Sequence, residues 1–229
     1  MPVDALLFDK DGTLFDFAAT WNGYTKTLIH NLSRGNKQVE TDLARVLDYD
    51  LGVGRFRPDS MAIASSNTEV AAVMAPFVDH MDAVELEQHL AVSAASANLA
   101  EAVPLQAFLD DLLARGKVLG VVTNDAEASA HSHLERAGVL DRFAFVAGCD
   151  SGFGTKPDPD PLLAFCREVG VAPARTAMVG DSRHDLEAGS AAGMRRIGVL
   201  TGLALREDLA PLADVVLPDI GHIPAWLDA

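Results

Sequence analysis

The sequence predicts an α/β fold, with a doubly wound, mostly parallel β-sheet and a helical segment inserted after its first strand. Beyond residue 102, short apolar runs alternate with helical periodicities, which is typical of a parallel sheet covered by helices. Several of these runs end abruptly in aspartate, asparagine or glycine, at the strand ends where α/β sheets carry their chemistry. Residues 17–98 show helical periodicity and almost no strand-like run, so we expect them to form the insertion.

The first strand is predicted at Ala5–Phe8, where four apolar residues precede the segment Asp9-Lys10-Asp11-Gly12. Such a short, wholly apolar run is typical of a strand that is buried on both faces. Side chains two positions apart point the same way in an extended chain, so Asp9 and Asp11 are expected to serve one site. Because two close carboxylates repel each other, they need a cation, a shared proton or a basic neighbour.

The insertion is predicted to contain four helices. The first carries apolar residues at steps of three and four from Trp21 to Leu32, the second lies around 43–47, the third begins at Thr68 as N-cap, and the fourth covers about 84–99. A loop over 50–59, which contains two glycines, a proline, Arg55 and Arg57, separates the second helix from the third.

Beyond residue 102, strands and helices are expected to alternate along the chain. Glycines at 116, 138 and 170 are expected to end three of the helices, because glycine adopts the left-handed backbone conformation without strain. The alternation implies a mostly parallel sheet with helices on both faces. Strands are predicted at 118–122, 143–147, 177–179, 197–200 and 215–217, and helices at 103–115, up to 137, 161–169 and up to 192.

Composition limits the kinds of partner. The chain has 33 acidic against 18 basic residues and a formal charge of −15, which argues against nucleic acid and anionic membranes as partners. No apolar run reaches the ~18 residues of a membrane span, and we expect no signal peptide. Cys149 and Cys166 form no Cys-x-x-Cys motif and fit a cytoplasmic location. A small phosphorylated substrate is compatible with the charge, and no oligomeric state is indicated.

Three further segments bring groups suited to phosphate and metal. Thr123 and Asn124 follow the strand at 118–122, Lys156 lies in the loop after the next strand, and Asp181 and Asp185 follow the strand at 177–179. Lysine neutralises phosphate as a point charge, and a carboxylate is favourable near the N-terminus of a helix. Because converging carboxylates would repel each other, we expect a hard cation with oxygen ligands, and Mg²⁺ fits best.

Taken together, the four segments resemble the motifs of the haloacid dehalogenase superfamily of phosphohydrolases, in its phosphoglycolate phosphatase-like branch. The resemblance covers residues 1–16 and about 100–200. It implies a Rossmann-like core domain of residues 1–16 and 100–229 and a helical, C1-type cap domain of residues 17–99. The segments that carry it are Asp9-Lys10-Asp11-Gly12-Thr13, Thr123-Asn124, Lys156-Pro157 and Gly180-Asp181-Ser182-Arg183-His184-Asp185.

The resemblance also implies an activity, the Mg²⁺-dependent hydrolysis of a small phosphomonoester, with phosphoglycolate as an example. Asp9 would be the nucleophile that forms an aspartyl-phosphate. Asp11 would protonate the leaving alcohol and then activate water against that intermediate.

The resemblance assigns the remaining motif residues to metal and phosphate. Asp9, Asp181 and the backbone carbonyl of Asp11 would hold Mg²⁺, and Asp185 would support the metal directly or through water. The phosphoryl oxygens would be bound by Thr123, Asn124 and Lys156.

Four other residues lie near these segments. Arg55 lies in the loop of the cap, and in related capped enzymes a loop at this position contacts the substrate, so Arg55 is a candidate substrate-binding residue; an ordinary surface arginine is the alternative. Lys10 stands where an apolar residue is frequent in the family, and we expect it to point away from the site into solvent. His131 and His133 are two positions apart on a helix and do not face each other, so no metal pair is expected.

Two other functions share much of this pattern. A sugar-phosphate mutase of the same superfamily would use the same residues but return the phosphoryl group to a sugar. A receiver-like phospho-aspartate signalling domain has a doubly wound sheet, an acceptor aspartate, a threonine and a lysine. Receivers are much shorter, have no helical cap and lack a second aspartate two residues after the acceptor. A dehalogenase is disfavoured because its chemistry needs neither Asp11 nor a metal.

Overall fold

The computed structural model describes residues 2–57, 60, 62, 65–95 and 97–229. The chain divides into two compact units, one made of the residues up to Phe17 together with Ala100–Ala229, the other of Ala18–Leu99. Positions 58–59 of the loop predicted at 50–59, and position 96 of the helix predicted at 84–99, lie outside the described residues.

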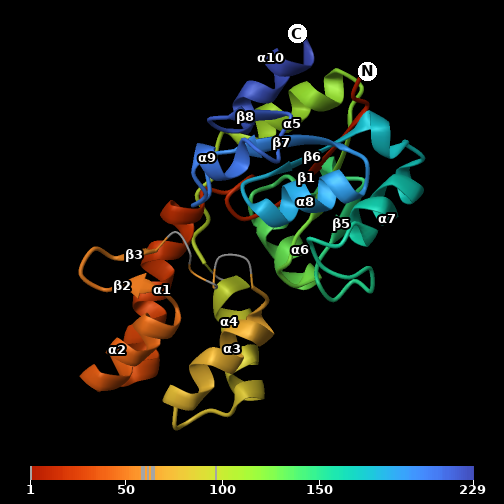
Figure 1. Ribbon diagram of the computed structural model, residues 1–229. Coiled ribbons are helices and arrows are strands. Elements are labelled where there is room, and N and C mark those ends of the chain that lie inside the picture. Colours follow the sequence, from red (N-terminus) through yellow and green to blue (C-terminus); the bar gives the residue numbers. More distant parts are fainter. Residues whose placement is uncertain (1, 58–59, 61, 63–64, 96) are drawn as a thin grey trace. The chain divides into compact units, whose positions relative to one another are not determined.

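The first unit contains a six-stranded sheet in the order β5-β4-β1-β6-β7-β8 (Figure 1). Every neighbouring pair is parallel. Because the chain moves outward from β1 first to one side and then to the other, the sheet is doubly wound and its crossover point lies beside β1. The strands are β1 (Ala5–Phe8), β4 (Val118–Val122), β5 (Phe145–Ala147), β6 (Thr176–Gly180), β7 (Arg195–Val199) and β8 (Val215–Leu217).

Helices cover both faces of this sheet (Figure 1). Leu7 shares a core cluster with Phe165 of α7 and Ala188 of α8, so these two helices lie on the face to which Leu7 points. Phe8 points to the opposite face, where the ring of Phe108 on α5 packs edge-to-face against it with centroids 6.1 Å apart. The helices of this unit are α5 (Leu105–Ala114), α6 (Glu127–Arg136), α7 (Asp160–Val169), α8 (Arg183–Ala191), α9 (Arg206–Leu209) and α10 (Ile223–Leu227).

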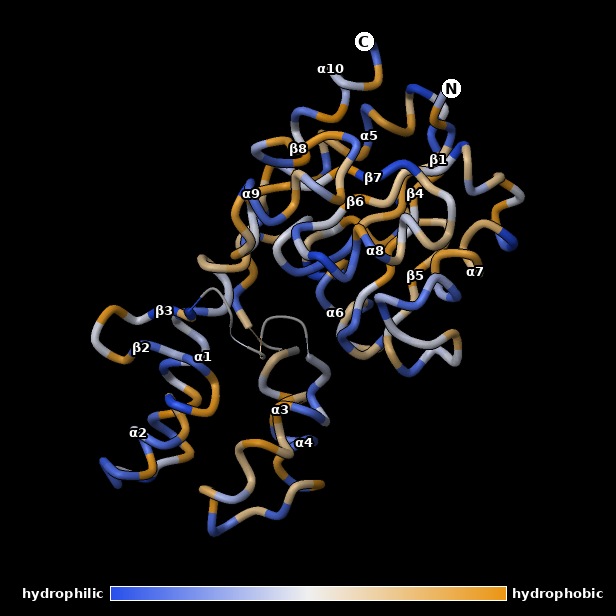
Figure 2. Tube along the Cα trace, viewed as in Figure 1, coloured by the Kyte–Doolittle hydropathy of each residue, from blue (hydrophilic) through white to orange (hydrophobic). Residues whose placement is uncertain are grey.

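The described residues of the second unit form helices and one short hairpin. Hydrophobic and hydrophilic positions alternate along its helices (Figure 2), as expected for helices that bury one face. Its third helix begins two residues earlier than predicted, because Ser66 rather than Thr68 caps it and forms a capping box with Glu69. The elements are α1 (Phe17–Ser33), α2 (Lys37–Val46), β2 (Tyr49–Asp50), β3 (Arg55–Phe56), α3 (Asn67–Met74), the 3₁₀ turn η2 (Ala75–Phe77) and α4 (Ala83–Ala95).

The predicted α/β fold, with its mostly parallel sheet and flanking helices, is confirmed. The two-residue strands β2 and β3 were not predicted, and all of their residues except Tyr49 lie in the segment predicted as a loop. Among the described residues, no helix is both long and apolar enough to cross a membrane.

Candidate active site

Three of the predicted site residues, Asp9, Thr123 and Asp181, directly follow the carboxyl ends of three adjacent strands. Asp9 comes directly after β1, and its N–H donates to the carbonyl of Val179 on β6 at 2.9 Å. Thr123 comes directly after β4, and Asp181 directly after β6. Because these strands are neighbours and parallel, their ends meet at one edge of the sheet beside the crossover point.

Three aspartates gather at this edge. Asp9, Asp181 and Asp185 each offer an oxygen within 4.8 Å of the others, and each residue is less than a tenth exposed. Burial, followed by the charge of Asp185, raises the pKa of Asp9 to about 7, although Lys156 opposes the shift. Burial and the charges of Asp9 and Asp185 raise the pKa of Asp181 well above its usual range. Without a cation, protons are therefore expected to neutralise part of this cluster near neutral pH.

Lys156 provides a positive charge inside the cluster. Its Nζ donates to Oδ1 of Asp9 at 2.5 Å and to Oδ1 of Asp185 at 2.7 Å, and the residue is only 4% exposed. Burial alone would lower the pKa of Lys156, but the two carboxylates raise it above its ordinary value. The ammonium therefore stays charged at a position that also suits a phosphoryl dianion.

Local backbone features fix the acidic side chains. Asp185 lies in the first turn of α8, where its Oδ2 accepts from the N–H of Ser182 at 3.0 Å and from the Ser182 hydroxyl at 2.6 Å. Gly12 is needed next to Asp181, because a Cβ there would lie 2.4 Å from Oδ2 of that aspartate, and its φ of +80° disfavours other residues. The Thr13 hydroxyl donates to Oδ1 of Asp181 at 3.3 Å.

Asn124 makes contacts that differ from the predicted ones. Its Nδ2 donates to the backbone carbonyl of Lys156 at 3.0 Å, and its Oδ1 accepts from the backbone N–H of the same residue at 3.0 Å. This pair fixes the loop that carries Lys156. The Thr123 hydroxyl accepts from the N–H of Asp125 at 3.1 Å and keeps its own proton for donation. Binding of phosphoryl oxygens by these two residues stays a prediction.

Asp11 lies next to the triad in sequence but has a different partner. Its carboxylate forms an ion pair with Lys10, and its side chain is 18% exposed. The expectation that Lys10 points into solvent is wrong, because Lys10 is completely buried and also contacts Asp125 and His133. Successive side chains of an extended chain point to opposite sides, which places Lys10 on the other side from Asp9. This alternation does not show that the long side chain of Lys10 reaches the carboxylate of Asp11.

Comparison with known proteins identifies the family. A family model described as haloacid dehalogenase-like hydrolase matches residues 3–193. The chain is a haloacid dehalogenase-like hydrolase. The resemblance stated from its motifs is thereby confirmed.

Several proteins named as phosphatases are similar to this hydrolase over most of their length. The N-acetylmuramic acid 6-phosphate phosphatase of Pseudomonas aeruginosa is 29% identical over 91% of this chain and 86% of that protein. The phosphoglycolate phosphatase of Xanthomonas campestris pv. campestris is 30% identical over 97% of this chain and 96% of that protein. A crystal structure of a predicted phosphoglycolate phosphatase from Haemophilus somnus shares the fold, with a TM-score of 0.73, 19% identity and coverage of 98% and 97%.

The donor set of the hydrolase fits a divalent metal. The three buried carboxylates offer only oxygen atoms, which are the ligands of hard cations. Asp185 is the least available of the three as a metal ligand, because both of its oxygens already accept hydrogen bonds. Lys156 donates to Oδ1, and Ser182 donates to Oδ2. A cation at the triad would relieve the repulsion that otherwise holds protons on Asp9 and Asp181.

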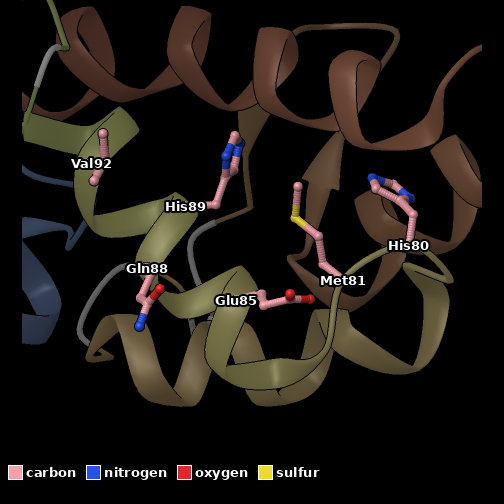
Figure 3. A pocket seen from close by; sticks show the side chains of 6 residues that line it. All are labelled: His80, Met81, Glu85, Gln88, His89 and Val92. Carbon is pink, nitrogen blue, oxygen red and sulfur yellow. The ribbon is translucent and has the colours of Figure 1, made fainter.

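Arg55 belongs to the second unit, where it begins strand β3 and is exposed. The hairpin turn before it is fixed by Asp50, whose Oδ1 accepts from the N–H groups of Gly52 and Val53 at 2.9 and 3.0 Å. The same unit has a hollow of about 470 Å³ beside α4. Figure 3 shows its lining, which contains two imidazoles and one carboxylate and which the sequence analysis did not single out. The lining residues are His80, Met81, Glu85, Gln88, His89 and Val92.

Sequence reasoning missed several residues that shape the active site. Ser182 caps α8 and Asp185 is the third residue of that helix, a capping-box spacing that could have revealed their contact. Gly202 follows β7, and a Cβ there would lie 1.7 Å from Oδ2 of Asp181. No sequence pattern signals that approach, since it depends on the neighbouring strands β6 and β7 lying side by side.

Proposed function

We propose that this hydrolase is a Mg²⁺-dependent phosphatase that acts on a small phosphomonoester through an aspartyl-phosphate on Asp9. The observation that carries the proposal is the contact between Lys156 and Asp9 inside the acidic triad. A nucleophilic carboxylate must meet a phosphate dianion, and the approach of two anions requires local positive charge. The ammonium of Lys156 lies 2.5 Å from Oδ1 of Asp9 and can supply that charge.

The proposed reaction has two steps, the formation of the aspartyl-phosphate and its hydrolysis. First, a carboxylate oxygen of Asp9 attacks phosphorus, the bond from phosphorus to the leaving alcohol breaks, and Asp11, which enters this step in its protonated form, gives that proton to the alcohol oxygen. Second, a water molecule attacks phosphorus while losing a proton to Asp11, and the bond from phosphorus to Asp9 breaks. Inorganic phosphate leaves, and both carboxyl groups return to their starting states.

The metal is proposed to be Mg²⁺, held by Asp9 and Asp181 with the backbone carbonyl of Asp11, and supported by Asp185. When bound, it would neutralise charge on the phosphoryl oxygens and on the cluster. Lys156 and Thr123 bind and orient the phosphoryl group in this proposal. Asn124 is proposed to bind the phosphoryl oxygens as well, and its two hydrogen bonds to the backbone of Lys156 hold that residue in place.

The substrate is proposed to be a small ester that also carries a carboxylate. The phosphatases similar to this chain are named for phosphoglycolate and for N-acetylmuramic acid 6-phosphate. Both compounds contain a carboxylate in addition to the phosphate. A guanidinium binds a carboxylate through paired hydrogen bonds, which supports Arg55 as the selecting residue of the 17–99 cap domain. The cytoplasmic location stays a prediction.

A panel of phosphate esters assayed with Mg²⁺ tests the proposed function. Release of inorganic phosphate from phosphoglycolate or N-acetylmuramic acid 6-phosphate, and its loss in EDTA, is the expected result. If no ester of the panel releases phosphate, the proposal is wrong. Phosphate that stays on the products after incubation with a bisphosphate sugar would indicate the mutase, and a long-lived phospho-aspartate would indicate the receiver-like function.

A further inference from the structure

Lys10 stands out because its charge is completely buried. The residue is 0% exposed, and an ammonium removed from water costs several kcal/mol unless other groups compensate it. Its Nζ contacts three side chains: the carboxylate of Asp11, Oδ2 of Asp125 at 3.2 Å and Nδ1 of His133 at 3.0 Å. An ammonium has three N–H donors, so it can donate to all three of these side chains.

Two of these partners form a fixed support on α6 and the turn before it. Oδ2 of Asp125 accepts from the Ser129 hydroxyl at 2.6 Å, and its Oδ1 accepts from the N–H of Ala126 at 2.8 Å. His133 is completely buried and lies four residues after Ser129, on the same side of the helix. Because an ammonium cannot accept a hydrogen bond, Nδ1 of His133 is the acceptor and the ring proton lies on Nε2.

The charges in this cluster favour one protonation state for the support. The ammonium of Lys10 forms ion pairs with the carboxylates of Asp11 and Asp125. Burial alone would raise the pKa of Asp125, but Lys10 and the hydrogen bonds to Asp125 lower it. The ammonium and the carboxylate therefore both stay charged and hold each other.

The third partner, Asp11, is the group that must move protons in the proposed reaction. We propose that Lys10 is a positioning residue for Asp11: anchored by Asp125 and His133, its ammonium holds the Asp11 carboxylate in the orientation needed for proton transfer. This inference rests on the proposed function. It also links two motifs, because the N–H of Asp125 donates to the Thr123 hydroxyl at 3.1 Å.

A leaving-group comparison separates positioning from a general structural role. Proton donation matters for an alkyl phosphate, whose alkoxide is a poor leaving group, and is dispensable for p-nitrophenyl phosphate. Water activation by Asp11 is required for both. The test uses Lys10→Met, which keeps the length and apolar stem of the side chain and removes the charge, with Lys26→Met on α1 as an exposed-lysine control.

With phosphoglycolate as the alkyl phosphate, we expect Lys10→Met to lower kcat by about a hundredfold, the lower range for lost acid–base catalysis, with little change in KM. With p-nitrophenyl phosphate, rapid mixing should show a first turnover near the wild-type rate, followed by a slow steady state. Lys26→Met should match the wild type with both substrates. An equal loss in the first turnover with both substrates, or no loss, would overturn the inference.

Asp125→Asn keeps the test valid if Lys10→Met does not fold, because it loosens the anchor and leaves both Lys10 and Asp11 in place. It should show the same split between substrates with a smaller loss, about tenfold. If that split is absent, the inference is wrong.

A crystal structure of the most stable of these variants tests the role of Lys10 independently of the proposed phosphatase activity. The Asp11 carboxylate should leave its wild-type orientation. An unchanged carboxylate would overturn the positioning role even in an active phosphatase. A wild-type protein that hydrolyses no ester would overturn the proposed function while this structural result still decides the role of Lys10.

Discussion

The Asp9→Asn variant should stabilise the metal-free protein while abolishing its activity. Without a metal, burial and neighbouring carboxylates raise the pKa of Asp9 from 3.8 to about 7. The native state therefore keeps this proton up to about pH 7, whereas the unfolded chain releases it near pH 4. Since the native state binds more protons in this window, stability falls as pH rises from about 4 to 7 and stays low above it.

The size of the effect follows from the same values. The difference between 3.8 and about 7, at about 1.4 kcal/mol per pH unit, makes ionised Asp9 cost the folded state up to about 4 kcal/mol at pH 8. Asparagine cannot ionise and still offers a carbonyl oxygen to Lys156. For a chain of this size, the melting temperature should rise by up to about 10 °C.

Thermal unfolding in EDTA at pH 4, 6 and 8 measures this difference directly. Asp9→Asn should exceed the wild type at pH 8, less so at pH 6, and hardly at pH 4. Asp79→Asn, at a fully exposed aspartate, is the matched control and should show no such trend. An Asp9→Asn variant that is less stable than the wild type at pH 8, or a difference that is independent of pH, would refute the reasoning.

Three further predictions concern turnover and metal. Mg²⁺ should raise the melting temperature of the wild type more at pH 8 than at pH 6, because the protons on Asp9 and Asp181 compete with the metal; a larger rise at pH 6 would contradict this. EDTA should abolish activity, Mg²⁺ should restore it, and Ca²⁺ should inhibit through its larger, looser coordination, whereas full activity in EDTA would exclude the metal site. Arg55→Ala should raise KM for a carboxylate-bearing ester by an amount worth about 1–3 kcal/mol, with a much smaller effect on p-nitrophenyl phosphate; equal effects on both would exclude Arg55 as the selecting residue.

The sequence predicted those parts of the fold that depend on local pattern. The strand at Val118–Val122 is found with its predicted bounds, because five apolar residues end in a polar turn. Gly170 ends α7 with a φ of +70°, as its position after the helical periodicity indicates. The strands β2 and β3 were missed because two-residue strands carry no periodicity.

Features that depend on contacts between distant segments could not be predicted. The burial of Lys10 requires Asp125 and His133, which lie more than a hundred residues away in the chain. The same holds for Asn124, whose amide is engaged by the backbone of Lys156. The motifs predicted which residue types serve the site, but the partners of each side chain are set by the sheet order, which no local pattern specifies.

The proposed mechanism requires Asp9 to carry the phosphoryl group between the two steps. Its most direct test is to mix the Asp11→Asn variant with p-nitrophenyl phosphate and Mg²⁺, quench in acid and locate the bound phosphoryl group by peptide mass spectrometry. This variant keeps the nucleophile but lacks the base that activates water, so the phosphoryl group should accumulate on the peptide containing Asp9. A phosphoryl group on another residue, or none on a variant that releases p-nitrophenol, would contradict the account.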